Sequence, residues 1–203
     1  MNIYDISQEV FECCVFPGDP APERIQLQKM SEGASCNLTA LKMCAHNGTH
    51  VDAPYHFIEN GETIDQVGLN RFAGYAYVAS HEGELSASDA DTIITEARSQ
   101  ASLSDIPGCD CFNRILVKGK AVVTEEAAEV FAKHKILLFG NESQTVGPED
   151  APMAVHKIML GSGIILLEGI RLSETEDGMY FLNAAPLNLG GSDGAPCRAW
   201  LMR

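Results

Sequence analysis

The sequence is poor in basic residues and in long apolar runs. Lysine and arginine number 14 against 28 aspartates and glutamates, which gives a formal net charge of -14. A surface of this sign repels phosphate backbones and anionic lipid headgroups, so nucleic acid and membrane surfaces are not expected as partners. The most apolar window, residues 158–167, is interrupted by glycine and serine and is too short to span a bilayer.

The sequence also lacks a secretion signal and a regular cysteine spacing. Residues 1–5 have neither a basic start nor a continuous apolar stretch. The seven cysteines are an odd number, which fits reduced thiols better than a disulfide framework. Cys109 and Cys111 have no second Cys or His pair nearby that would complete a zinc site. We therefore expect a cytoplasmic protein with free thiols.

No internal repeat, flexible linker or like-charge run divides the 203 residues, so a single domain over residues 1–203 is predicted. Short apolar or alternating runs predict strands at residues 25–30, 37–45, 75–80, 115–118, 136–139, 164–168 and 196–201. Helices are predicted over residues 89–100, 125–134 and 151–160. The expected N-cap of the first helix is Ser88, which forms a capping-box pattern with Asp91, and that of the second is Thr124. The third helix has Pro152 near its start and Gly161 where it would stop. The fold class is α/β, with a mixed sheet and flanking helices.

Three imidazoles and one carboxylate gather in a single short segment. Of only six histidines in the chain, His46, His50 and His56 lie within eleven residues, together with Asp52. One histidine alone would more often be a polar residue satisfied by backbone hydrogen bonds. Imidazole and carboxylate together are the ligands that suit zinc, manganese or iron, and an enzyme site leaves one coordination position open. The segment therefore predicts a metal centre.

Gly48 is the residue that makes this spacing workable. In a straight strand the backbones of His46 and His50 would be about 13 Å apart, which is too far for a shared ion. A glycine can adopt positive φ and turn the chain, so we expect Gly48 to bring the two rings together. His50 and Asp52 are about 6.6 Å apart in extended chain and can reach one ion directly.

The pattern His-x-Gly-Thr-His-x-Asp-x-Pro-x-His, complete from His46 to His56, resembles the signature of the cyclase superfamily, which includes bacterial kynurenine formamidases and isatin hydrolases. The turn Phe16-Pro17-Gly18-Asp19, the later pair His156 and Glu168, and the segment at residues 191–199 are similar to further motifs of that family. The resemblance covers nearly the whole chain and implies a single-domain, swivelling β/β/α-like cyclase fold.

The resemblance also implies a site with one or two divalent ions, zinc first and manganese as the alternative. One ion would be bound by His46, His50 and Asp52, and the other by Asp52 and His156, with Glu168 reaching both. His56 is left for proton transfer. Independently of the family, a carboxylate such as Glu168 at the end of an apolar strand is costly to bury unpaired, so a cation partner is expected there.

The implied reaction is hydrolysis of a carbon–nitrogen bond other than a peptide bond. The expected substrate is a small aryl formamide such as N-formyl-L-kynurenine, cleaved to the amine and formate in tryptophan catabolism. Metal-activated hydroxide would attack the acyl carbon while His56 transfers the proton. Phe16 and Phe57 are the expected substrate contacts, although formamidases usually have Trp where this chain has Phe16. Asn141 and Gly147 also replace acids that are common in the family, and a homodimer or homotetramer is expected.

Two other readings remain open at the level of sequence. Ring-opening of a cyclic amide, as in isatin hydrolases, needs the same hydroxide and a different pocket. A non-catalytic protein that binds metal or a small ligand would keep the scaffold and lose turnover. The presence of His56 argues against the second reading, because a binding protein has no need of a proton-transfer group.

Overall fold

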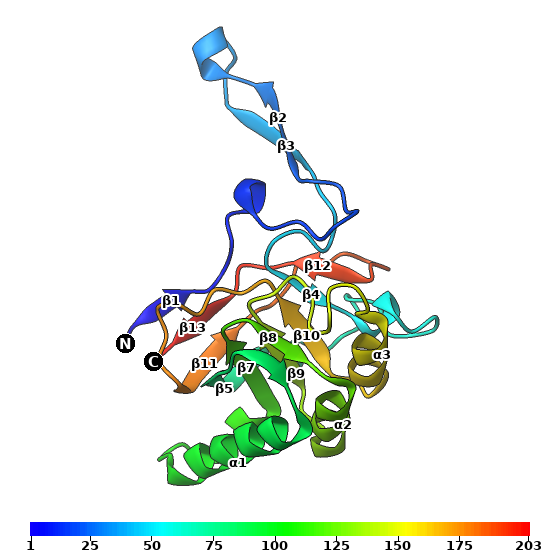
Figure 1. Cartoon of the computed structure of the whole chain (residues 1–203). Coiled ribbons are helices and arrows are strands. Elements are labelled where there is room, and N and C mark those ends of the chain that lie inside the picture. The colour runs from blue at the N-terminus through cyan, green and yellow to red at the C-terminus, as the bar shows by residue number, and fades with distance from the viewer.

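A mixed nine-stranded sheet forms the centre of the structure, a computed structural model that describes residues 1–203 (Figure 1). In sheet order the strands are β1 (Ile3–Asp5), β13 (Trp200–Met202), β11 (Gly178–Asn183), β5 (Ala73–Ser80), β7 (Arg114–Lys118), β9 (Leu138–Asn141), β10 (Ile165–Glu168), β4 (His50–Asp52) and β12 (Gly194–Pro196). The four adjacent strands from β5 to β10 in this order are parallel to one another, and all other neighbouring pairs are antiparallel.

The parallel strands are apolar on both faces. Ile115, Leu116 and Val117 in β7 are all fully buried, with Ile115 and Val117 in one apolar cluster and Leu116 in another. Parallel strands covered on both sides have this continuous apolar character. The predictions for residues 75–80, 115–118 and 164–168 are confirmed within two residues, and the strand predicted at 136–139 begins two residues later.

Three helices cover one face of the sheet: α1 (Ala87–Leu103), α2 (Glu125–His134) and α3 (Met153–Gly161) (Figure 1). None of them combines the length and the apolar character needed to cross a membrane. The prediction for α2, with Thr124 as its N-cap, is confirmed, and α3 begins two residues later than predicted.

The predicted N-cap of α1 is wrong by two residues. Ser86, not Ser88, caps the helix: its hydroxyl accepts from the Asp89 N–H at 3.3 Å, and the Asp89 carboxylate accepts from the Ser86 N–H at 2.9 Å. Both serines are followed three residues later by an aspartate, so the local pattern fits either. Leu85, buried at the end of strand β6 (Gly83–Leu85), brings the chain into the core immediately before Ser86 and so places the helix start there.

The sheet curls strongly, as the link between β12 and β13 shows. These strands are seven places apart in the sheet order but are joined by only residues 197–199. In a flat sheet they would be about 34 Å apart, whereas this link reaches about 14 Å at most. The curled sheet encloses a second apolar cluster on the face away from the helices, which contains Val51, Leu167 and Leu182. The single strand predicted at 196–201 is therefore wrong, because the chain leaves one strand and enters another.

Two further strand pairs lie outside the main sheet. β6 (Gly83–Leu85) and β8 (Ala121–Val123) pair in parallel beside it. β2 (Glu23–Gln28) and β3 (Leu38–Lys42) form an antiparallel ribbon that stands away from the rest of the molecule (Figure 1). The sequence predicts both ribbon strands but places them in the sheet. That placement is wrong, since nearly every ribbon residue is exposed and none joins the core clusters.

Candidate metal centre

Strand β4 carries two of the predicted ligands and is placed between β10 and β12. His50 and Asp52 alternate with Val51, so both point to one face of the sheet while Val51 enters the core of the other. Glu168 lies directly opposite His50 in the register of β10 with β4. Opposite residues of antiparallel strands share a face. The sheet register alone therefore brings His50, Asp52 and Glu168 together.

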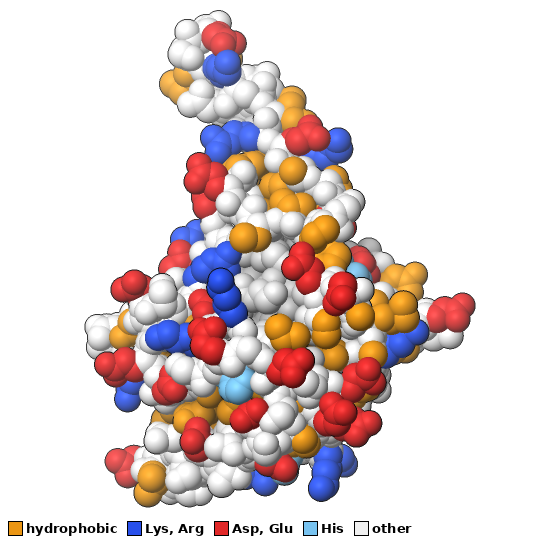
Figure 2. All heavy atoms as spheres, viewed as in Figure 1, with side chains coloured by type: hydrophobic (Ala, Val, Ile, Leu, Met, Phe, Trp, Pro, Cys, Tyr) orange, Lys and Arg blue, Asp and Glu red, His pale blue; other side chains and the backbone are white.

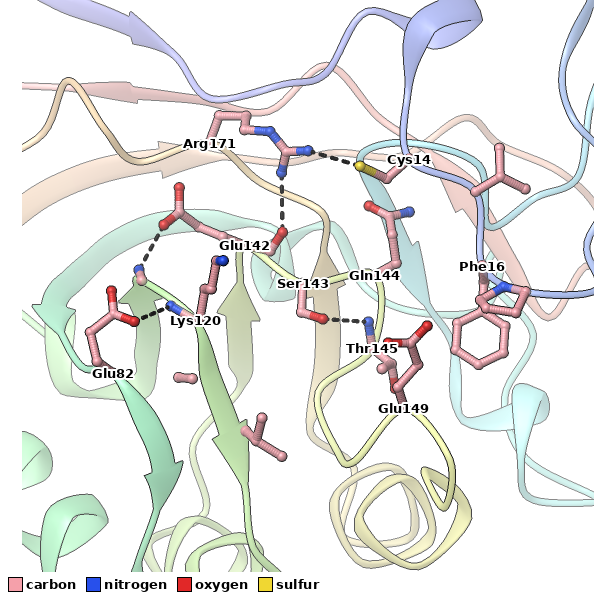
Figure 3. Close-up of a pocket in the computed structure, with 15 residues that line it drawn as sticks. Cys14, Phe16, Glu82, Lys120, Glu142, Ser143, Gln144, Thr145, Glu149 and Arg171 are labelled. Atoms are coloured by element: carbon pink, nitrogen blue, oxygen red, sulfur yellow. Dashed lines mark hydrogen bonds between the residues drawn. The ribbon is translucent and has the colours of Figure 1, made fainter.

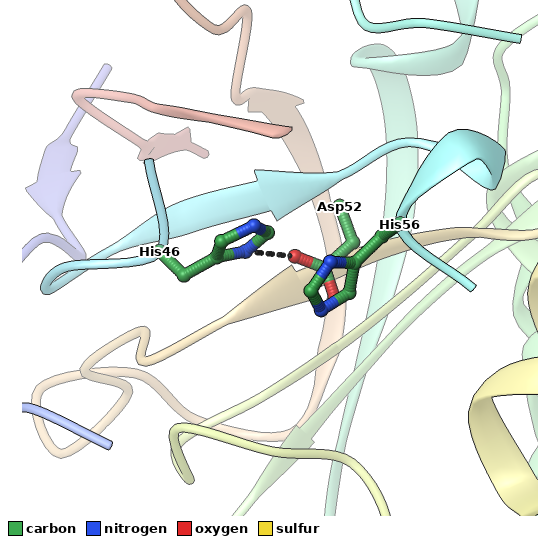
Figure 4. A group of neighbouring side chains, drawn as sticks. All are labelled: His46, Asp52 and His56. Atoms are coloured by element: carbon green, nitrogen blue, oxygen red, sulfur yellow. Dashed lines mark hydrogen bonds and ion pairs between the residues drawn. The ribbon is translucent and has the colours of Figure 1, made fainter. Parts of the chain in front are cut away.

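The turn before β4 brings in His46. Gly48 has φ of +67°, a left-handed conformation that glycine adopts without strain, as predicted. The His46 and His50 rings meet edge to face with centroids 5.1 Å apart, far closer than an extended chain would allow. His46 Nδ1 lies 2.8 Å from Asp52 Oδ1 (Figure 4). The expected convergence around Gly48 is confirmed.

The second half of the site comes from α3. His156 is buried on this helix, and its Nε2 lies 3.3 Å from Glu168 Oε1 and 3.7 Å from Asp52 Oδ2. On the other side of the same two carboxylates, His50 Nε2 lies 3.4 Å from Asp52 Oδ1 and 3.4 Å from Glu168 Oε2. Asp52 and Glu168 therefore each present one oxygen to His50 and the other to His156.

Backbone carbonyls fix which nitrogen of each ring faces these carboxylates. His50 Nδ1–H donates to Gly48 O at 3.0 Å, and His156 Nδ1–H donates to Pro152 O at 2.8 Å. A carbonyl only accepts, so in the neutral ring Nε2 carries a lone pair. Metal-binding histidines are oriented in this way, with the second nitrogen held by a carbonyl or a carboxylate.

A divalent cation fits the residues that are present. Two ligand atoms on one tetrahedral zinc ion are about 3.3 Å apart, close to the spacings between His50 or His156 and the two carboxylates. Asp52 Oδ2 is buried without any hydrogen-bond partner, which is costly for a carboxylate oxygen that lacks a cation. Ligand atoms of two groups, His50 with Asp52 and Glu168, and His46 with Asp52 and His56, lie within 4.8 Å of one another.

Without a cation the histidines hold protons strongly. Burial lowers the pKa of His46, but hydrogen bonds to Asp193 and Asp52 outweigh it and raise this pKa to about 11. Burial is likewise outweighed at His50, whose pKa is raised to about 9 by Asp52 and Glu168, and the pKa of His156 is raised in the same direction by Glu168. Burial alone would raise the pKa of Asp52, yet the imidazoles hold it well below its usual range. Protons and a cation therefore compete for one set of groups.

His56 lies at the edge of this cluster and is held by a residue that the sequence analysis did not select. Its Nδ1 donates to Asp193 Oδ2 at 3.1 Å, and its ring stacks on His46 with centroids 4.1 Å apart (Figure 4). The same Asp193 oxygen lies 2.9 Å from His46 Nε2. Hydrogen bonds from His46 and His56 lower the pKa of Asp193. His56 Nε2 has no hydrogen-bond partner in the protein and is available to a ligand.

A cavity of about 220 Å³ opens over the cluster. Both predicted substrate contacts lie in its wall: Phe16 is half-buried, and Phe57 packs on the His156 and His56 rings at 4.6 and 4.5 Å. The wall is formed by Phe16, Asp19, His46, His50, His56, Phe57, Gln144, Thr145, Pro152, His156 and Glu168. Asp19, Gln144 and Thr145 were not predicted, although Asp19 and Asp193 both occur in glycine–aspartate turns of motifs quoted above.

The loop after β9 supports the ligands from behind. Glu168 Oε1 accepts from the Val146 N–H at 2.9 Å. Gln144 Nε2 donates at 3.1 Å to Gly48 O, the carbonyl that also orients His50, while Gln144 Oε1 accepts from Gln8 at 2.7 Å. Amide and backbone groups of this loop thus hold Glu168 and the carbonyl that orients His50.

Several known proteins are similar to this chain. The family described as "Putative cyclase" matches residues 4–148. A kynurenine formamidase of Salinibacter ruber is 30% identical, covering 99% of this chain and 97% of the relative. A structure described as a predicted metal-dependent hydrolase from Bacillus stearothermophilus is 26% identical with a TM-score of 0.76, covering 98% and 97% of the two chains. Isatin hydrolase A from Labrenzia aggregata, 20% identical with a TM-score of 0.78 and coverage of 98% and 93%, shares the fold. Because the family match spans more than half of the sequence, this chain belongs to the cyclase family and is a hydrolase of that family.

Proposed function

We propose that this chain is a metal-dependent amide hydrolase that cleaves an aryl formamide such as N-formyl-L-kynurenine to the amine and formate. The observation that carries the proposal is the arrangement of Asp52 and Glu168, each with one oxygen toward His50 and the other toward His156. The similarity to a kynurenine formamidase supports the substrate class. The reaction belongs to tryptophan catabolism.

In this proposal two groups of ligands share Asp52 and Glu168. His46 and His50 would bind the cation at one of two metal positions, and His156 would bind the cation at the other. Zinc is the first choice of metal, with manganese as the alternative. A bound divalent cation lowers the pKa of its water to near neutral and stabilises charge on the carbonyl oxygen. The buried carboxylates hold compensating negative charge in a site closed to bulk water on the sheet side.

His56 performs the proton transfer. Its Nδ1–H bond to Asp193 leaves Nε2 bare at the cavity wall, in the tautomer that accepts a proton. The protonated ring, stabilised by the Asp193 carboxylate, then donates the proton to the departing nitrogen. Phe16 and Phe57 provide the apolar walls against which an aryl ring packs.

The proposal includes a homo-oligomer in the cytoplasm. An isolated two-stranded ribbon is marginal in water, yet β2, β3 and the turn between them expose Leu27, Met30 and Leu41 by 56–60%. Figure 2 shows apolar side chains on the part of the molecule that projects from the body. Residues 23–42 carry three basic and two acidic residues, and both acids pair with lysines of the ribbon, so the ribbon keeps a small positive charge, opposite in sign to the chain's net charge of -14. Seven unpaired cysteines suit a reducing compartment.

The test is turnover of N-formyl-L-kynurenine, simple formanilides and isatin by purified protein, before and after chelation and with zinc or manganese restored. We expect metal-dependent hydrolysis of the formamides, with metal content by elemental analysis rising in parallel. Preferred cleavage of isatin would favour the ring-opening reaction. Metal binding without turnover of any amide would refute the proposed activity and favour a binding protein.

A further inference from the structure

A second, larger cavity adjoins the metal centre. It has a volume of about 690 Å³ and shares Phe16, Gln144 and Thr145 with the smaller cavity (Figure 3). Pockets for small organic ligands commonly occupy about 300–1,000 Å³. The metal-side cavity of about 220 Å³ is below that range. Because the two cavities share these residues, a substrate larger than a formanilide head has room to extend past Thr145 into the larger cavity.

Most charged groups around this cavity are already committed to the protein. Glu142 accepts from the N–H groups of Gly119 and Leu172 at 2.6 and 2.7 Å, and Glu82 Oε2 accepts from the Lys120 N–H at 3.3 Å. Arg171 Nη1 donates to three backbone carbonyls, the nearest at 2.8 Å. These groups hold loops together and have little capacity left for a ligand.

Two charged side chains of opposite sign are free. The Lys120 ammonium and the Glu149 carboxylate line the cavity and form no hydrogen bond or ion pair with any side chain or backbone group (Figure 3). Long charged side chains without partners are ordinary on a convex surface, but here both border one concavity. They can bind a ligand that carries a negative and a positive group at once.

Thr145 provides an independent sign of a ligand at the junction of the two cavities. The residue is only 5% exposed, and its Oγ1 is buried without a hydrogen-bond partner. Buried hydroxyls are nearly always hydrogen-bonded, so an unpaired one indicates that its partner comes from outside the protein. A carbonyl or amide group of a ligand that passes from one cavity to the other would provide it.

We propose that the larger cavity binds the zwitterionic α-amino carboxylate tail of the substrate, with Lys120 on the carboxylate, Glu149 on the ammonium and Thr145 on a polar group between tail and head. This inference rests on the proposed function and names the part of the substrate outside the metal centre. Charge balance favours a zwitterion, since the lining has three glutamates against Lys120 and Arg171 and the chain is strongly acidic. A simple anion would be repelled by this field, whereas a zwitterion has no net charge.

The experiment compares three substrates with one formanilide head on the metal-loaded enzyme: N-formyl-L-kynurenine, its desamino analogue and tail-less 2-formamidoacetophenone. Lys120→Met should lower kcat/KM about tenfold for the two carboxylate-bearing substrates and leave the tail-less one unchanged. Glu149→Gln should lower it for N-formyl-L-kynurenine alone. Lys133→Met, an exposed lysine of α2 away from the cavity, is the matched control.

Equal effects of Lys120→Met on all three substrates, or none on any, would overturn the tail site while the hydrolase remains. Turnover of none of the three refutes the proposed function instead. In that case calorimetric binding of L-kynurenine, which has the same tail, still tests the site. About tenfold weaker binding to Lys120→Met supports it, and unchanged binding contradicts it.

Discussion

At the scale of single residues, three imidazoles of the site differ in what surrounds their two ring nitrogens. His50 and His156 donate to backbone carbonyls and direct Nε2 at two buried carboxylates. His56 donates to the half-exposed Asp193, and its Nε2 has no protein partner. Rings whose Nε2 faces two buried carboxylates suit cation binding, whereas a ring whose Nε2 is free at a cavity wall suits proton transfer.

This difference predicts different losses on substitution. His56→Ala should retain bound metal and reduce kcat by about 10²–10⁴-fold, because only proton transfer is removed. His50→Ala and Asp52→Ala should lose both metal and activity. Elemental analysis after gel filtration, paired with turnover of N-formyl-L-kynurenine, separates the two classes. Loss of metal in His56→Ala would show that this residue is a ligand, within the 4.8 Å group it forms with His46 and Asp52.

The raised histidine pKa values predict how the metal-free protein responds to pH. Groups whose pKa is higher in the folded chain contribute stability in full below their unfolded value, near 6.5 for histidine, and lose it as pH rises through the folded value. With folded values of about 9 for His50 and about 11 for His46, the Tm of chelated protein should fall as pH rises from about 6.5 to 9. Zinc should restore it at pH 9, since a cation replaces the protons.

Differential scanning fluorimetry over this pH range, with chelator or zinc, checks the expectation. His50→Gln provides the control, because removal of one of the titrating rings should flatten the decline. A Tm of the chelated protein that rises or stays level between pH 6.5 and 9 would contradict the assignment of protonated histidines to the metal-free state.

At the scale of elements, α1 shows how tertiary packing selects between two equivalent local patterns. Ser86 and Ser88 each precede an aspartate by three residues, and the buried Leu85 places the start of the helix at the first. The cap satisfies backbone N–H groups that have no partner within the helix.

Ser86→Ala should therefore lower the free energy of unfolding by about 1 kcal/mol, the usual contribution of an N-cap. Ser88→Ala, on the exposed first turn of the same helix, should change it by less than about 0.5 kcal/mol. Urea unfolding followed by circular dichroism measures both. A larger loss for Ser88→Ala than for Ser86→Ala would contradict the observed cap.

At the scale of the whole molecule, the curled sheet and the projecting ribbon have different roles. The sheet closes its own core and leaves the candidate metal centre beside β4. The ribbon emerges between Pro20 and Lys42 (Figure 1), close in sequence to Phe16 and His46, and leaves exposed leucines that nothing in the chain covers. The ribbon is therefore the surface on which we expect a second copy to bind.

Leu27→Glu combined with Leu41→Glu should convert the proposed oligomer to monomer without loss of secondary structure, because charge replaces apolar surface at the contact. Analytical ultracentrifugation gives the mass. Leu103→Glu is the control, since this leucine at the end of α1 is 78% exposed and lies outside the ribbon. A wild-type monomer, or an unchanged oligomer in the double variant, would exclude the ribbon as the interface.

The sequence by itself determined the features that depend on neighbours a few residues apart. The short apolar or alternating runs predicted strands at β5, β7 and β10, and the cap and length of α2 were predicted correctly. The spacing of His46, His50 and Asp52 required a turn at Gly48, and that turn is present. Such features are local because strand alternation, helix capping and glycine φ are set by the nearby chain.

The tertiary structure alone decided what depends on long-range contacts. Strand register places Glu168 opposite His50, a loop near the C-terminus brings Asp193 to His56, and the loop after β9 places Thr145 between two cavities. It also separated the ribbon strands from the sheet and split residues 196–201 between β12 and β13. Sequence spacing carries no measure of sheet order or curl, and these decide which residues more than a hundred positions apart meet around the site.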